Sequence, residues 1–266
     1  MVGVRMWLRA TGKVLFPLML ATQTIAMLNV QGVPGSDLPG WSFDWSWMLS
    51  VWTGSTILLS PLSAASVVLL QIRAWRPPGD DLVAGLPRAL RSRSDMVWTV
   101  FLSGLAVQGA TLLIASLCCV AGHADASGLT LPWQLFTGPC ALLASTWLGA
   151  MVGEFWKDPW GVPVTAIGVF MFQNVFFWKG YPELLSTEMA TGPVTGARPI
   201  PAHLMATCGS NLALALACAC ITLWHVRSRR QRRHLLLLLA GLALAAVVAI
   251  FHPFAASGAL DTYEMR

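Results

Sequence analysis

Few side chains in this sequence could do catalytic or metal chemistry, and those few stand at the ends of apolar runs. His123 and Asp125 have the spacing of two metal ligands, but their surroundings predict an exposed loop, which favours a solvated pair over a metal site. Gly40-Trp-Ser42 is the only Gly-x-Ser element that a serine hydrolase could use, and it also falls in a predicted loop. Haem and quinone subunits place histidines on paired spans, a pattern that this sequence lacks. We therefore expect no catalytic residue, no cofactor-binding residue, no metal ligand and no enzymatic activity.

Amide side chains are the strongest polar groups expected deep inside the apolar runs. Carriers driven by ions or protons usually keep an Asp, Glu, Arg or Lys within the membrane, and the predicted spans contain none. Amides form hydrogen bonds between helices but do not titrate, so a packing role is favoured over contact with a substrate. If cargo passes through the bundle, the candidate substrate-path residues are Gln108, Gln173, Asn174 and Asn211.

The composition identifies the class of protein. Of 266 residues, 56% are hydrophobic and only 11% are charged, whereas soluble domains carry roughly 25% charged residues. The net charge of +5 comes from basic residues at the ends of apolar runs, without the interleaved aromatic residues of a nucleic-acid surface. The sequence therefore predicts an integral membrane protein without a nucleic-acid partner.

Seven apolar runs are long enough to cross a bilayer as helices. We expect an all-α fold, a polytopic transmembrane helical bundle of about six to seven spans. The second span contains Ser60-Pro61, and proline removes a backbone hydrogen bond there, which predicts a kink. The predicted spans are residues 14–30, 48–70, 96–121, 135–152, 162–178, 206–224 and 235–251.

The ends of these spans predict the orientation in the cell membrane. Five arginines lie between His225 and His234, in a short bend between two apolar runs, and short basic loops stay on the cytoplasmic side. Arg5, Arg9 and Lys13 recur every four residues and predict an amphipathic interfacial helix before the first span. We expect a multi-pass protein with a cytoplasmic N-terminus and an extracellular C-terminus.

The order of these elements resembles the ABC type-2 transporter permeases over about residues 1–224. Two stretches carry this resemblance and are similar to actinobacterial members. The first is Ser60-Pro-Leu-Ser-Ala-Ala65, leading through Arg73 and Arg76 to Leu86-Pro-Arg88, and the second is Leu148-Gly149 with Gly153 before Pro159. The resemblance implies the membrane subunit of an ATP-driven exporter whose cargo is a hydrophobic or amphipathic peptide, lipid or drug. It implies as partners membrane lipid, a second permease in a homo- or heterodimer, and an ABC ATPase subunit that holds ATP and Mg.

By position, the resemblance divides the chain into an interfacial helix (residues 1–13), a six-span permease-like domain (14–224) and a basic inner loop with an extra span and an outer tail (225–266). The extra span departs from the usual six with both ends inside. Residues 180–205 correspond to an outer re-entrant gate. Residues 81–91 and 154–160 correspond to two segments that press into the ATPase. These ATPase-coupling candidates are Asp81, Leu82, Leu86, Arg88, Leu90, Arg91, Glu154, Trp156 and Asp158.

Two alternatives and one packing motif complete the prediction. Glu154 and Asp158 fit a solvated loop as well as they fit docking. Gly149 and Gly153 form a GxxxG pattern that lets another helix backbone approach closely. The chain as a whole also fits a non-transporting membrane scaffold or immunity protein that binds a transporter or a peptide.

Overall fold

The structure is a computed structural model that describes residues 2–28, 38–74, 87–126, 129, 132–177, 184–185, 197–226, 233–256 and 263–265. Nearly all of this part of the chain is helical. The elements are α1 (Val2–Leu28), the 3-10 turn η1 (Gly40–Phe43), α2 (Trp45–Gly54), α3 (Thr56–Ala74), α5 (Pro87–Ala121), α6 (Trp133–Phe155), α7 (Gly161–Phe177), α8 (Pro201–Val226), α9 (Arg233–Ala256) and the strands β1 (Ala197–Pro199) and β2 (Tyr263–Met265).

Four helical stretches in the described residues are long and apolar enough to cross a membrane. At about 1.5 Å per residue, even the 23-residue stretch exceeds a hydrocarbon core of about 30 Å. These lengths and compositions are those of a helical membrane protein. The four stretches are Trp45–Ala74, Arg93–Ala121, Trp133–Phe155 and Pro201–His225, and two shorter apolar helices are Gly12–Leu28 and Leu236–Ile250.

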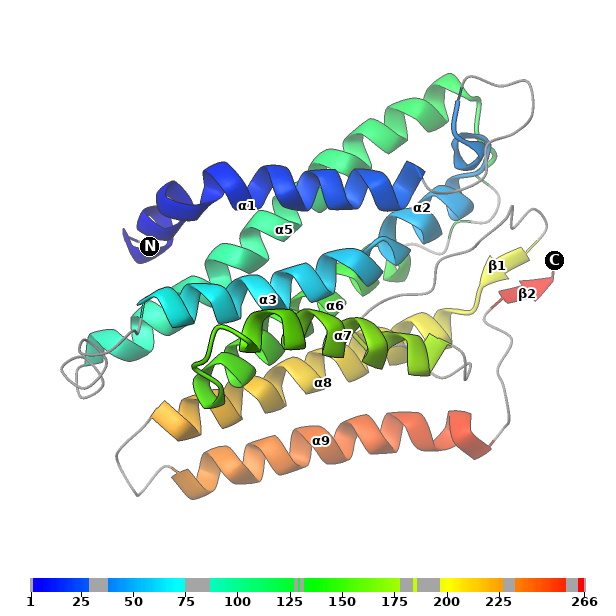
Figure 1. Cartoon of the computed structure of the whole chain (residues 1–266). Helices are drawn as coiled ribbons and strands as arrows, with labels where there is room; N and C mark the ends of the chain where they lie inside the picture. Colours follow the sequence, from blue (N-terminus) through cyan, green and yellow to red (C-terminus); the bar gives the residue numbers. More distant parts are fainter. Residues whose placement is uncertain are drawn as a thin grey trace.

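The helices lie side by side, with α1 along one edge of the bundle and α9 along the other (Figure 1). The most extensive contacts join α6 to α8, α3 to α6 and α8 to α9, so α6 occupies the middle of the assembly. At one end β1 pairs antiparallel with β2, Ala197 opposite Met265 and Pro199 opposite Tyr263. This pairing ties the C-terminal tail to the segment before α8.

Helix α1 is continuous from Val2 to Leu28 and so runs through residue 13, where the predicted interfacial helix meets the first predicted span. No proline or turn sequence interrupts residues 10–13, and Pro17 lies inside the helix. The side chains of residues 2–11 lie outside the described set, and with them Arg5 and Arg9 of the predicted basic stripe; Lys13, its third member, is exposed.

The second predicted span is divided between two helices, and the break precedes the proline at which a kink is expected. The helix breaks at Ser55, and Pro61 lies inside α3. The hydroxyl groups of Thr53, Ser55 and Thr56 each donate to a carbonyl three or four residues earlier. Such bonds compete with the backbone N–H groups for the same carbonyls and bend helices. The break therefore lies within a run of hydroxyl residues and precedes the proline.

Two helices begin at least about five residues earlier than the hydrophobic pattern predicts, and each begins at a proline. Helix α5 starts at Pro87 instead of residue 96, and α8 starts at Pro201 instead of residue 206. Proline suits the first helical position because its missing N–H would have no partner there. His203, which the sequence places in a loop, is consequently a buried residue in the first turn of α8.

Candidate functional site

Glu154 is the charged centre of the candidate site. It lies in the last turn of α6 and only 6% of it is exposed, so its side chain is neither that of a solvated loop residue nor placed on the surface for docking. Its Oε1 lies 3.3 Å from Nη1 of Arg93, whose side chain is also buried. The Nε2 of His225, a half-exposed residue, lies 4.0 Å from the same oxygen. We call Arg93, Glu154 and His225 the Glu154 cluster.

The early start of α5 explains how the cluster forms. Because α5 begins at Pro87, Arg93 lies nearly two turns inside the helix, at a depth that the predicted span did not reach. A cavity of about 10 Å³ beside Arg93 holds at most about one water molecule, so this side of the pair is closely packed. The ring of Phe155 lies 4.7 Å from that of His225. The cluster thus joins α5, α6 and α8.

The segment that follows α6 is an exposed, ordered loop, residues 156–160. The backbone N–H of Trp160 donates to Oδ1 of Asp158 at 2.9 Å, and the N–H of Gly161 donates to the Asp158 carbonyl at 2.9 Å. These bonds form the turn that starts α7. Trp156 is 42% exposed and Trp160 is 72% exposed. The loop therefore presents two large aromatic side chains immediately beside the buried Glu154.

The other predicted coupling segment is described only in part. Arg88, Leu90 and Arg91 lie in the first turns of α5, and not in a separate short helix, because the helix begins at Pro87. Their side chains are outside the described set. Asp81, Leu82 and Leu86 also lie outside the described residues.

Gly149 and Gly153 place α6 directly against α3. A Cβ atom on Gly149 would lie 2.8 Å from the Cα of Ala64, and one on Gly153 would lie 3.2 Å from the Cα of Val68. The second would also collide with the side-chain amide oxygen of Gln71. Only glycine allows this approach of two backbones, which fixes the height of Glu154 relative to α3.

Gln173 and Asn211 meet around one backbone position, Leu185. The Leu185 N–H donates to Oδ1 of Asn211 at 2.8 Å, and Nε2 of Gln173 donates to the Leu185 carbonyl at 2.7 Å. Leu185 is 1% exposed and has a φ of 65°, in the left-handed region that residues with a side chain rarely adopt. Because buried backbone groups need hydrogen-bond partners, these two amides hold Leu185 between α7 and α8.

The other two substrate-path candidates lie apart from this contact. Nδ2 of Asn174 donates to the Phe170 carbonyl of its own helix at 2.7 Å. Gln108 is fully buried in α5, where its backbone carbonyl accepts from the indole N–H of Trp52 at 2.9 Å. Its side-chain amide has no hydrogen-bond partner among the described residues. Nε2 of Gln23 donates to the Trp52 carbonyl at 3.3 Å. Gln108 and Gln23 therefore flank the helix break at Ser55.

Sequence reasoning missed the ion pair between Arg93 and Glu154. Arg93 lies just before the third predicted span and Glu154 just after the fourth, so the predicted topology places these opposite charges at the same membrane surface. This was the signal that could have identified the pair.

Comparison of the chain with protein-family models, with curated proteins and with solved structures found no match.

Proposed function

We propose that this chain is the membrane subunit of an ATP-driven ABC exporter that moves a hydrophobic or amphipathic cargo. In this proposal α1, the α2–α3 pair and α5 to α9 all cross the membrane, with the N-terminus in the cytoplasm and the C-terminus outside. A second permease chain completes the pathway, as a homo- or heterodimer, and separate ATPase subunits bind ATP and Mg. Residues 156–160 bind the ATPase.

The observation that carries this proposal is the combination of an exposed aromatic loop with a buried ion pair beneath it. Trp side chains are enriched among the residues that dominate protein–protein binding energies, and Trp160 is 72% exposed. Glu154 lies two residues before Trp156 and contacts Arg93 of α5 and His225 of α8. A displacement of the loop would therefore move three helices together.

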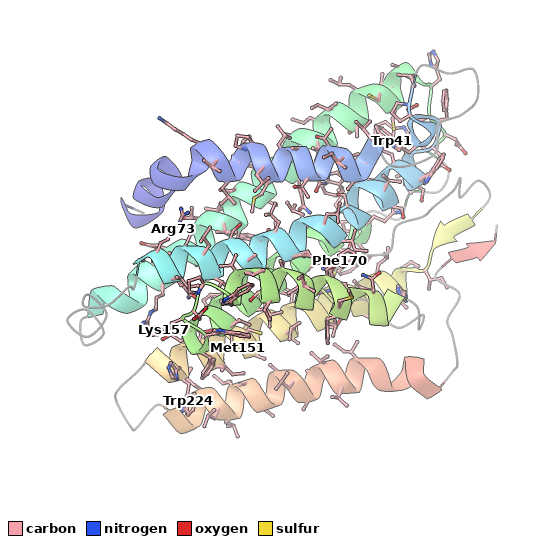
Figure 2. The ribbon with its side chains drawn as sticks, viewed as in Figure 1. Trp41, Arg73, Met151, Lys157, Phe170 and Trp224 are labelled. Carbon is pink, nitrogen blue, oxygen red and sulfur yellow. The ribbon has the colours of Figure 1, made fainter. Side chains whose placement is uncertain are left out.

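The geometry also supports a cytoplasmic position for this loop. His225 begins the arginine-rich bend of residues 225–234, and its imidazole lies 4.0 Å from Glu154. Figure 2 shows Lys157, Trp224 and Arg73 at one end of the bundle and Trp41 at the opposite end. His225, where the arginine-rich bend begins, and residues 156–160 thus lie at the same end of the bundle, and short basic loops remain in the cytoplasm.

Co-purification tests this function. Full-length tagged chain extracted from its native cells in mild detergent is expected to retain an ATPase in stoichiometric amount, with nucleotide-dependent activity. Trp160→Ala is expected to lower the affinity for that ATPase at least about tenfold, because a central Trp contributes about 2 kcal/mol or more to binding. Pull-down yield at graded ATPase concentrations measures the loss.

Phe136→Ala is the matched control, because Phe136 is a 53% exposed aromatic residue near the other end of α6. It is expected to leave the ATPase affinity unchanged. A native complex without any ATPase contradicts the proposal and favours the scaffold or immunity alternative. Equal losses from Trp160→Ala and Phe136→Ala contradict the docking role of residues 156–160.

A further inference from the structure

We infer that a groove between α1, α3 and α7 binds an anionic phospholipid, with one acyl chain along the groove and the phosphate at Arg73. The groove has a volume of about 330 Å³, within the range of small-molecule sites. This inference does not depend on the proposed function. The residues that line it include Val14 and Leu18 from α1, Leu62, Ser66 and Arg73 from α3, and Val162 from α7.

The walls of this groove are apolar along their whole length. Ser66 is the only neutral polar residue among them, and its hydroxyl donates to the Leu62 carbonyl of its own helix at 2.7 Å. Val14 is 73% exposed and Leu18 is 48% exposed, so the α1 side of the groove opens outward, where the membrane lies. An acyl chain fits these walls because it brings no polar group that would need a partner.

Arg73 supplies the only charge of the groove and stands at one end of it. It lies in the last turn of α3, is exposed, and has no ion-pair partner within the part of the chain that the structure describes. Lys13, also exposed, precedes Val14 at the same end of the groove. Figure 2 shows Arg73 on the side of α3 that faces α1. A guanidinium group binds phosphate oxygens through paired hydrogen bonds.

Apolar walls with a cation at one end match a phospholipid better than a second protein chain. The apolar part of the ligand must lie in the bilayer while its anionic part lies at the surface, where a long arginine side chain also places its charge. Anionic lipids are the abundant membrane molecules that combine the two parts. We therefore assign the groove to a phospholipid whose headgroup carries a net negative charge.

Lipid binding to the full-length chain tests this inference. The delipidated protein is titrated with phosphatidylglycerol, phosphatidylcholine or inorganic phosphate, and native mass spectrometry measures the lipid retained while the thermal midpoint reports stabilisation. One phosphatidylglycerol is expected to bind at least about fivefold more tightly than phosphatidylcholine. This difference in affinity is about what one basic residue contributes at an anionic surface. Inorganic phosphate is expected neither to bind nor to stabilise.

Two variants separate the headgroup from the acyl chain. Arg73→Ala is expected to remove the preference for phosphatidylglycerol and to keep the affinity for phosphatidylcholine. Ser66→Phe fills the groove and is expected to weaken both lipids, whereas Leu113→Phe, at a 70% exposed position on α5, is expected to change neither. An unchanged lipid preference in Arg73→Ala, unchanged lipid binding in Ser66→Phe, or competition by inorganic phosphate overturns the inference.

Discussion

Replacing Gly149 by leucine is expected to prevent the protein from folding stably, with a loss of the monodisperse species in detergent. Gly149 faces the backbone of Ala64, and even one added carbon would lie 2.8 Å from the Ala64 Cα. Backbone atoms inside a helix cannot rotate away as a side chain can. Helices α3 and α6 would have to separate, and α6 also packs against α8.

Gly149→Ala gives a graded version of this test. Over-packing a close contact costs about 1–3 kcal/mol, and we expect a value near the upper end because both atoms in conflict belong to backbones. The thermal midpoint in detergent, followed by fluorescence-detected size exclusion, measures the change.

Gly168→Ala is the control, because a Cβ at Gly168 of α7 meets no atom within 4 Å. Alanine favours the helix over glycine by about 0.5–1 kcal/mol, so this variant is expected to be as stable as the native chain or more stable. Native stability in Gly149→Ala and Gly149→Leu would contradict the close packing of α6 on α3.

Glu154→Ala is expected to destabilise the protein by about 3–5 kcal/mol. The substitution leaves the buried guanidinium of Arg93 without its carboxylate, and an uncompensated buried charge is costly. His225→Gln removes only a half-exposed group at 4.0 Å from Glu154, and we expect a loss below about 1 kcal/mol. The free energy of unfolding, measured by denaturant titration in mixed micelles, compares the two variants.

The double variant Arg93→Met with Glu154→Leu separates charge from packing. Apolar residues of similar volume often replace a buried ion pair without loss, so the double variant is expected to recover most of the stability that Glu154→Ala loses. If Glu154→Ala is as stable as the native chain, the pair is not buried in the folded protein. If the double variant is as unstable as Glu154→Ala, the charge is not the cause.

The hydrophobic pattern predicted the helices well and their ends less well. A run of apolar residues locates the centre of a helix well, because the signal is summed over many residues and no single one decides it. The ends depend on single residues: Pro87 and Pro201 begin their helices before the apolar run does, and Ser55 breaks one within a run. Pro61 was the stronger breaker by sequence, but the helix continues through it and breaks at Ser55, within a run of hydroxyl residues bonded to the preceding turn.

The site was less predictable because it depends on contacts between distant residues. Glu154 and Arg93 are 61 positions apart, and each alone has the sequence pattern of a residue at a membrane surface. The amides at Gln173 and Asn211 were recognised as polar groups at depth, but their partner is the backbone of Leu185, which no pattern in the sequence identifies. Only the fold brings these groups together.

Photo-crosslinking from residue 160 is the most direct test of a permease driven by a partner ATPase. A photoreactive phenylalanine analogue replaces Trp160 in the whole chain. A separate control variant carries the analogue in place of Phe136. Illumination in native membranes is expected to join residue 160, and not residue 136, to a subunit that binds ATP, with a yield that changes when nucleotide is added. If residue 160 forms adducts only with lipid, or with proteins that do not bind ATP, the account is contradicted.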